Sequence, residues 1–443
     1  MLYKLFKTYL RLFHDIVFYR HTYSINQGVI QKKGVLQLIV SNHQNCLNDA
    51  LGILFAFYDR KVNFITRGDI FTISPLAKKF FLSIGLLPSF RLATEGAEQL
   101  ERNKATFRIS EQALLSGRTV VMFPEAGHQD KRWLGNFSLG YTKLAFEAAE
   151  LGNFEKEIFI VPSCNHYSNY FGIQNDFMVK FGTPISLTPY YELYKTKPRT
   201  AQRQVNALVR KQIESLMLNI TDLDNYDTID FMRETFGYQY AAKMGLNPKY
   251  LPDRLEADKK MYATLEDVKS KDSQKIEKLY ADAAELKSEI HKAGITERQI
   301  RSNHVAGRAA LYLFGLILLL PIGVISMWPA LFIYAVGMLV FKKFAKDHMF
   351  QGTFLYAISA LFTIPISAII TLVVTWIYIN WWSAVLYFLL TSLLLIFAWY
   401  YVQSIKVLWY DIKALCKRSK TKELRTKYAA LKEKLMDIIF SSK

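Results

Sequence analysis

A histidine and an aspartate lie close together in the sequence, just after an apolar run. The segment SNHQNCLND follows the run at 35–40, and it contains His43 and, six positions further on, Asp49. An imidazole titrates near neutral pH, and a nearby carboxylate can hold its tautomer and stabilise the imidazolium, which is what a base that activates a hydroxyl needs. A second interpretation stays open for this pair alone: His43 caps a strand and Asp49 caps the next helix.

Two further segments place charged residues in turns. The sequence GLLPSFR at 85–91 puts Arg91 in a turn, and FPEAGHQDKR at 123–132 follows another buried strand with a carboxylate, Glu125, and a cluster of cations. Such cations suit a substrate that carries phosphate. His128 in this segment is open to two interpretations, a phosphate contact and a structural or solvated position.

Four segments of the chain resemble, in order and spacing, the glycerol-phosphate and lysophosphatidate acyltransferase superfamily. They are SNHQNCLND, GLLPSFR, FPEAGHQDKR and IFIVP. The resemblance covers roughly residues 20–220 and is closest to a subgroup that has five residues between the histidine and the aspartate and a C-terminal membrane domain. Ala126 departs from the family pattern, because glycine is usual after the glutamate. The methyl group of Ala126 is expected to tighten or reshape the acceptor pocket.

The resemblance implies a role for each matching residue. His43 would be the general base on the acceptor hydroxyl, Asp49 would orient it, and the hydroxyl would attack an acyl thioester directly, without an acyl-enzyme. The resemblance also implies a set of substrate-binding residues: Asn45, Arg91, Glu125, Gly127, Pro162 and His128. Pro162 would lie near the wall that binds the acyl chain. No metal or cofactor is expected, and acyl-CoA or acyl-carrier protein would be the co-substrate.

The expected function is transfer of a fatty acyl group to the hydroxyl of glycerol 3-phosphate or lysophosphatidate in phospholipid synthesis. Two alternatives remain, acyl transfer to an amino-acid-derived lyso-lipid and a non-catalytic lipid-binding membrane scaffold whose pocket Ala126 disables. Cys46 lies between the base and its carboxylate but has no orienting group of its own, so we interpret it as a packing residue. His166, after the fourth block, is interpreted as structural.

The fold that must position these residues is predicted to be α/β. Short β-rich runs alternate with helical patterns, which favours a mostly parallel sheet with flanking helices over residues 21–235. The runs are at 35–40, 62–66, 119–123, 158–162 and 177–182. Apolar residues at helical spacing predict a closing helix over 198–219.

Residues 1–20 are predicted to form an amphipathic helix. Apolar positions recur at helical spacing, with Lys4, Lys7 and Arg11 on another face, and the segment lacks the features of a signal peptide. The helix is expected either in the membrane interface or packed on its own domain.

Residues 236–306 are predicted to be a helical linker. Within 252–300, apolar residues from Ile276 to Ile290 form a stripe that ends before Gly294. This stripe needs a partner, and we expect either a helical hairpin that docks on the catalytic domain or a contact with another subunit, which makes an oligomer an option.

Residues 307–405 are predicted to be a transmembrane region. Residues 309–341 and 349–405 contain no charged residue, far more than the about 20 residues that cross a bilayer. The second stretch predicts helices at 354–378 and 382–405, and Pro321 and Pro329 in the first stretch favour a broken hairpin. The segment DHMFQGTF at 347–354 loosely resembles a juncture of the same subgroup, and the alternative is a loop with a helix start.

Charge supports a membrane location. The formal net charge is +18, and basic residues exceed acidic ones at both ends, in residues 1–33 and in the tail 406–443. Basic stretches beside apolar segments favour anionic lipid headgroups, with nucleic acid a distant second. Three widely spaced cysteines indicate neither a disulfide framework nor a zinc site. We expect an integral membrane protein with its catalytic domain on the cytoplasmic face.

Overall fold

The structure is a computed structural model of the 443-residue chain. It describes residues 2–30, 34–57, 60–68, 71, 74–89, 107–125, 131–344, 350–360, 364–378 and 380–441. The chain forms two compact units, the first made of Met1–Asn219 with Asp347–Thr353, and the second of Ile220–Lys346 with Phe354–Lys443. The first unit thus ends at residue 219, earlier than the predicted domain end at 235, and it regains a short segment from far along the chain.

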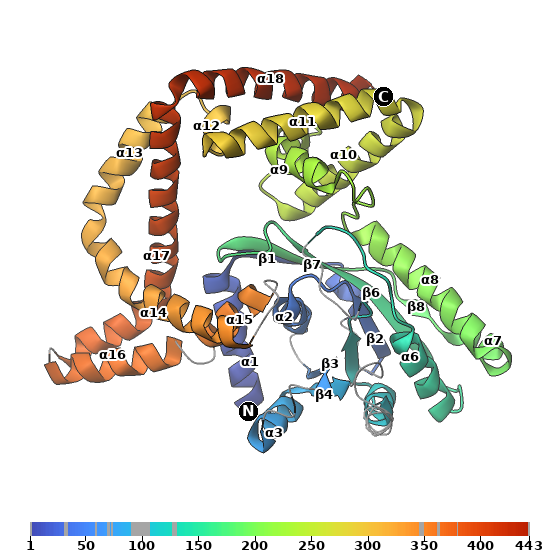
Figure 1. The fold of residues 1–443 in the computed structure, drawn as a ribbon. Helices are drawn as coiled ribbons and strands as arrows, with labels where there is room; N and C mark the ends of the chain where they lie inside the picture. Colours follow the sequence, from blue (N-terminus) through green and yellow to red (C-terminus); the bar gives the residue numbers. More distant parts are fainter. Residues whose placement is uncertain are drawn as a thin grey trace. The chain divides into compact units, whose positions relative to one another are not determined.

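The first unit is built on a sheet of eight strands (Figure 1). The strands are β1 (Tyr19–Ile25), β2 (Leu36–Ser41), β3 (Val62–Arg67), β4 (Leu86–Ser89), β5 (Thr119–Met122), β6 (Ile158–Tyr167), β7 (Asn175–Phe181) and β8 (Ile185–Ser186). Their order is β1-β7-β6-β2-β5-β3-β4, with β8 beside β6. β6 runs antiparallel to β7 and β8, and the remaining pairs are parallel. The predicted mostly parallel α/β fold is confirmed.

All six residues of the central strand β2 are buried, as expected for a strand that is covered on both faces. The helices of this unit include α1 (Leu2–Leu12), α2 (Cys46–Ala56), α3 (Pro75–Ile84), α6 (Gly140–Leu151), α7 (Tyr191–Thr196) and α8 (Pro198–Leu216), and residues 107–115 are helical as well. The predicted helix over 1–20 is shorter than expected: a π-helical turn at Phe13–Phe18 follows α1, and the chain then enters β1.

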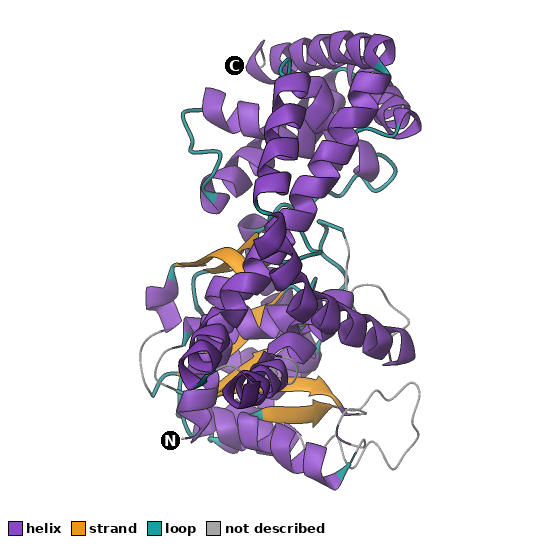
Figure 2. Cartoon of the chain, turned by 90° about the vertical axis from the view of Figure 1, so that its left-hand side faces the viewer, coloured by secondary structure: helices purple, strands orange, loops and turns teal. Residues whose placement is uncertain are grey.

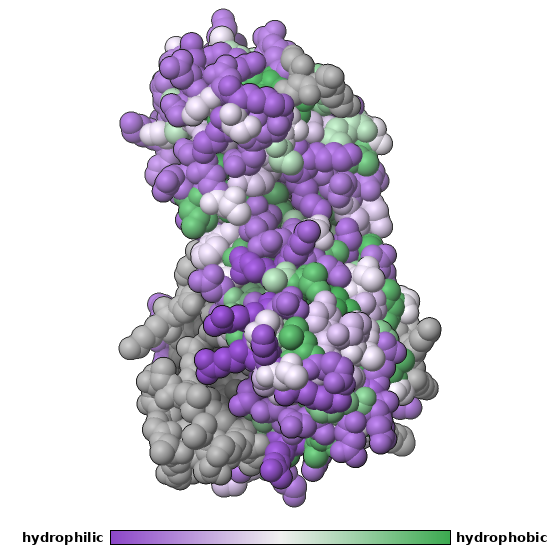
Figure 3. All heavy atoms as spheres, turned by 90° about the vertical axis from the view of Figure 1, so that its right-hand side faces the viewer, coloured by the Kyte–Doolittle hydropathy of each residue, from purple (hydrophilic) through white to green (hydrophobic). Residues whose placement is uncertain are grey.

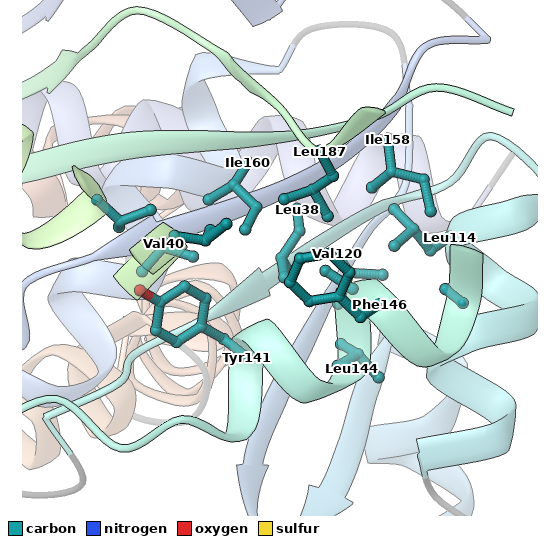
Figure 4. Packing of buried hydrophobic residues seen from close by; sticks show 14 of the residues in the cluster. Leu38, Val40, Leu114, Val120, Tyr141, Leu144, Phe146, Ile158, Ile160 and Leu187 are labelled. Carbon is teal, nitrogen blue, oxygen red and sulfur yellow. The ribbon is translucent and has the colours of Figure 1, made fainter. Parts of the chain in front are cut away.

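One core fills the space between the sheet and the helices α6 and α8 (Figure 4). Leu38 and Val40 of β2 point into it together with Tyr141 and Phe146 of α6. The helix α2 packs instead against β7, where a Cβ added to Gly52 would lie only 2.1 Å from a ring carbon of Phe177. This close approach requires glycine and fixes the distance between α2 and the sheet.

In the second unit the regular elements of the described residues are helices, and the described strands all lie in the first unit (Figure 2). One part of it consists of α9 (Tyr226–Lys243), α10 (Leu251–Lys271), α11 (Ser273–Ala293), α12 (Glu297–Arg301) and α18 (Arg418–Ser441). The predicted stripe of α11 is buried against α9, α10 and α18. The stripe is thus covered within the chain and within this unit. The face of these helices drawn in Figure 3 is mostly hydrophilic.

The predicted basic tail contains the helix α18, which packs on α11 of the same chain. In α18, Lys427 pairs with Glu285 and Glu289 of α11, each at 2.7 Å, and Lys434 pairs with Asp282 at 2.6 Å. Part of the positive charge of residues 406–443 is therefore matched by acidic residues of α11.

The other part of the second unit is apolar and exposed. It comprises α13 (Val305–Leu318), α14 (Leu320–Phe344), α16 (Ile364–Tyr378), α17 (Trp381–Cys416) and the second part of α15 (Phe350–Ile358), whose residues 350–353 belong to the first unit. Two stretches among the described residues, Leu320–Lys343 and Leu393–Cys416, are long and apolar enough to cross a membrane by length and composition. Many large apolar side chains of these helices are exposed, which fits association with a membrane.

The expected boundaries in this region change in detail. The first apolar stretch breaks at Leu319, so that Pro321 lies in the first turn of α14, where proline is tolerated. The predicted helix over 354–378 falls on the end of α15 and on α16, with 361–363 outside the described residues. The predicted helix over 382–405 is the middle of the longer α17.

Candidate active site

The structure brings His43 and Asp49 together at the carboxyl end of β2. The strand ends at Ser41, His43 lies in the turn, and Asp49 lies in the first turn of α2. The Nδ1 atom of His43 is 2.9 Å from Oδ2 of Asp49. Asp49 is completely buried, whereas the His43 side chain keeps 17% of its surface exposed. The carboxylate is thus shielded while the imidazole remains within reach of a substrate.

Several donors hold the Asp49 carboxylate in place. Its Oδ2 atom accepts hydrogen bonds from the backbone N–H groups of Gln44 at 2.8 Å and Asn45 at 2.7 Å, in addition to the contact with His43. Its Oδ1 atom accepts a bond of 2.6 Å from the Tyr167 hydroxyl. A carboxylate that accepts so many hydrogen bonds is fixed in its orientation. The interpretation of Asp49 as only a helix cap does not account for the contacts with His43 and Tyr167.

Tyr167 is the last residue of β6, which pairs with β2. Its side chain is fully buried, and this burial, together with the charge of Asp49, raises the pKa of the Tyr167 hydroxyl well above its usual value of 10. The hydroxyl therefore keeps its proton and acts as a permanent donor to Asp49.

A second carboxylate controls the backbone of the histidine. Glu125 follows β5, which lies beside β2, and its Oε1 atom accepts a hydrogen bond of 2.7 Å from the N–H group of His43. Its Oε2 atom accepts another of 2.7 Å from the N–H group of Gly135. Burial raises the pKa of Glu125, and the two N–H donors oppose this rise. The ring of Phe123 stacks on the His43 imidazole with centroids 4.2 Å apart.

One comparison with known families covers the part of the chain that contains this site. Residues 23–165 match the family model described as Acyltransferase. This part of the chain is an acyltransferase domain. It contains His43, Asp49 and Glu125 and ends at residue 165, two residues before the end of β6.

The other comparisons add less. A solved structure, the 1-acyl-sn-glycerophosphate (LPA) acyltransferase PlsC from Thermotoga maritima, is similar to the chain with a TM-score of 0.32 and 14% sequence identity. The similarity covers 47% of this chain and 79% of that one. No curated protein matches the sequence.

The remaining predicted substrate-binding residues of the acyltransferase domain divide into two groups. Asn45 is buried, its Nδ2 atom donates to the carbonyl of Tyr170 at 3.1 Å, and its Oδ1 atom accepts from Asn48 at 3.3 Å. Pro162 lies inside β6 opposite Val40 of β2. Arg91, Gly127 and His128, with Ala126, lie outside the described residues.

The structure adds residues that the sequence reasoning missed. Gln44 donates from its side chain to the carbonyl of Lys131 at 3.1 Å and accepts from the Tyr170 hydroxyl at 2.8 Å. The buried Arg132 donates to the carbonyl of Tyr167 at 3.0 Å and lies 5.1 Å from the ring of Tyr170. These contacts tie the histidine turn to the segments after β5 and β6. Tyr167 follows the fourth block by five positions, at the end of the same strand, and this was its only signal in the sequence.

The residues interpreted from the sequence as packing and structural, Cys46 and His166, are both buried. Cys46 begins α2 and His166 lies within β6, and the two are 5% exposed each. Cys46 has a left-handed backbone with φ 46°, which is uncommon for a residue other than glycine. Over the described stretches, no group of three or more His, Cys, Asp or Glu side chains is arranged to hold a metal.

Proposed function

We propose that this chain transfers a fatty acyl group from acyl-CoA or acyl-carrier protein to the hydroxyl of glycerol 3-phosphate or lysophosphatidate. The observation that carries this proposal is the contact of 2.9 Å between His43 and a buried, multiply hydrogen-bonded Asp49 inside the acyltransferase domain. The acceptor class is taken from the sequence resemblance. The cationic side chains in the segments 85–91 and 123–132 suit an acceptor that carries phosphate.

The proposed reaction needs one base and no covalent intermediate on the protein. Because Nδ1 of His43 faces Asp49, Nε2 is the nitrogen that takes the proton from the acceptor hydroxyl. The hydroxyl oxygen then attacks the thioester carbonyl, the carbon–sulfur bond breaks, and the sulfur leaves with the proton that His43 returns. Asp49 stabilises the imidazolium between these steps. The products are an ester and a free thiol.

We further propose that the reaction takes place at a membrane, on the cytoplasmic side. The two apolar stretches Leu320–Lys343 and Leu393–Cys416 would anchor the chain. Basic residues at 342–348 and after 406 flank these stretches, which favours the cytoplasmic side for both ends under the positive-inside rule. The exposed Leu5, Leu12 and Ile16 in the first eighteen residues fit a segment that lies in the interface.

The proposal is tested by an acceptor screen. The full-length chain, purified in detergent and returned to lipid vesicles, is incubated with a labelled acyl-CoA or acyl-carrier protein and one acceptor at a time. Glycerol 3-phosphate, lysophosphatidate and an N-acyl amino acid with a free hydroxyl are compared. We expect labelled product and thiol release with one of the two glycerol phosphates.

The outcomes separate the proposal from its alternatives. Product from the N-acyl amino acid alone would replace the proposed acceptor but keep the reaction. Lipid binding without thiol release, for every donor and acceptor, would contradict the proposal and favour a scaffold.

A further inference from the structure

A short segment from much later in the sequence contacts the turn that carries His43. Residues Asp347–Thr353 belong to the first unit, although the chain on both sides of them belongs to the second. Of this segment, Gly352 and Thr353 in α15 contact the first turn of α2. The acyltransferase match at 23–165 does not include them.

Thr353 supplies a hydrogen-bond acceptor that α2 lacks in its own sequence. The Oγ1 atom of Thr353 accepts a bond of 3.0 Å from the backbone N–H group of Leu47. The first N–H groups of a helix have no partner within it and are usually satisfied by a side chain just before the helix. In α2 the residue in that position, Asn45, makes no such bond, because its side chain is turned to Tyr170 and Asn48.

Gly352 allows the backbone of α15 to come close to this turn. A Cβ at this position would lie 3.3 Å from Oδ1 of Asn45 and 3.5 Å from Nδ2 of Asn48. The first distance is tighter than ordinary contact, so any side chain at 352 would press on Asn45. The backbone N–H group of Asn45 in turn donates to Asp49.

The turn that these two residues contact is strained. Cys46 precedes Leu47 and has φ 46°, a left-handed conformation that costs an L-residue energy and persists only where its surroundings hold it. The N–H groups of Gln44 and Asn45 point at Asp49 only while this turn keeps its shape. A contact at Leu47 therefore acts on the geometry of the His43–Asp49 pair.

We propose that Thr353 and Gly352 are positioning residues for the His43–Asp49 pair. Thr353 caps α2 through Leu47, Gly352 provides the space for this contact, and together they hold the carboxylate against the imidazole. This proposal rests on the proposed acyl transfer, since it assigns the two residues an effect on its turnover. The active site then includes a segment that lies 306 positions from the turn in the sequence.

The test compares matched variants of the full-length chain in vesicles. Thr353→Val removes the acceptor at nearly constant volume, and Thr353→Ser keeps it. Gly352→Ala adds a methyl group against Asn45, whereas Gly307→Ala adds one to another helical glycine with nothing within 4 Å. Steady-state kinetics give kcat and KM, and hydrogen exchange of the peptide that spans residues 43–50 reports on the turn without any activity.

We expect Thr353→Val to lower kcat about tenfold, as for loss of a helix cap, with KM for both substrates within about twofold. Thr353→Ser should restore the wild-type value. Exchange over 43–50 should become about tenfold faster in Thr353→Val and Gly352→Ala and stay unchanged in Gly307→Ala. If Thr353→Val does not fold, kcat and the exchange over 43–50 are compared between Gly352→Ala and Gly307→Ala. Lower kcat with faster exchange in Gly352→Ala alone supports the proposal, and equal values in the two variants contradict it.

Three results would overturn the proposal: wild-type kcat in Thr353→Val, an equal loss in Thr353→Ser, or faster exchange over 43–50 without loss of kcat. If the wild-type chain itself releases no thiol with any acceptor, the proposed function fails. The exchange data then decide by themselves whether Thr353 and Gly352 hold the turn.

Discussion

Replacing Glu125 by glutamine tests whether this carboxylate positions His43 or binds the acceptor, as the sequence resemblance implies. In the structure its two oxygens accept hydrogen bonds from the N–H groups of His43 and Gly135, each at 2.7 Å. A glutamine has one carbonyl oxygen and an NH₂ group in place of the second oxygen. The substitution therefore leaves one of the two N–H groups facing another donor.

The size of the effect follows from these two bonds. A hydrogen bond to a charged group contributes about 1.5–3 kcal/mol, and glutamine loses one such bond and weakens the other. The raised pKa of Glu125 shows that burial of its charge is unfavourable, so the neutral side chain regains part of this loss. We expect a net effect of about 2 kcal/mol, which corresponds to about a 30-fold lower kcat.

The assay measures thiol release while each substrate is varied in turn. A positioning role predicts that Glu125→Gln lowers kcat and leaves the KM for the acceptor nearly unchanged. The matched control is Glu157→Gln. Glu157 is exposed, and it accepts a hydrogen bond from Ser186, far in the sequence from the His43–Asp49 pair. A rise in the acceptor KM at constant kcat would refute the positioning role and favour direct binding of the acceptor.

Three other substitutions probe the first unit. Tyr167→Phe removes the donor 2.6 Å from Asp49 and should lower kcat by about tenfold or more, measured by thiol release. Gly52→Ala should lower the unfolding free energy by about 1–3 kcal/mol, and kcat with it, because the new methyl group overlaps Phe177. Burial lowers the pKa of His14 below 6.5, so the unfolded chain binds a proton that the folded chain does not. The unfolding free energy should therefore fall as the pH drops below this value, by at most about 1.4 kcal/mol per pH unit, and His14→Gln should remove this dependence in thermal melts.

Each of these predictions has a control. Tyr141→Phe removes the hydroxyl of another buried tyrosine, which donates to Asn206, and should leave kcat within about twofold. Gly28→Ala adds a methyl group with nothing within 4 Å and should keep kcat. In the His14 test, the neighbouring Asp15 does not contribute to the slope in the same pH range. Burial raises the pKa of the Asp15 carboxyl, but its hydrogen-bond partners outweigh this and lower that pKa below 3.8. Wild-type kcat in Tyr167→Phe or Gly52→Ala, or the same pH slope in His14→Gln, would contradict the respective prediction.

The sequence predicted the central part of the fold well, because β2, β3, β5, β6 and β7 are buried apolar runs. It missed β1, β4 and β8 for identifiable reasons. β1 reads YRHTYSI, which has few apolar residues, β4 has four residues with a proline, and β8 has only two. These strands gain their pairing from neighbours that local periodicity does not reveal.

The site was predictable only in part. His43 and Asp49 are close in sequence and follow a strand, so their contact could be expected. The donors that complete the site come from distant positions: Tyr167 lies 118 residues from Asp49, and Thr353 lies 306 residues from Leu47. Such contacts depend on strand order and on the return of a late segment to the first unit, and neither leaves a local pattern.

The most direct test of the proposed reaction is the turnover of His43→Ala. The variant and the wild-type chain are compared in vesicles by release of thiol from a labelled acyl thioester in the presence of the acceptor that the screen identifies. Loss of a general base predicts a turnover about 100- to 10,000-fold lower, with the fold and the binding of the donor preserved. Turnover equal to that of the wild-type chain would contradict the assignment of His43 as the base.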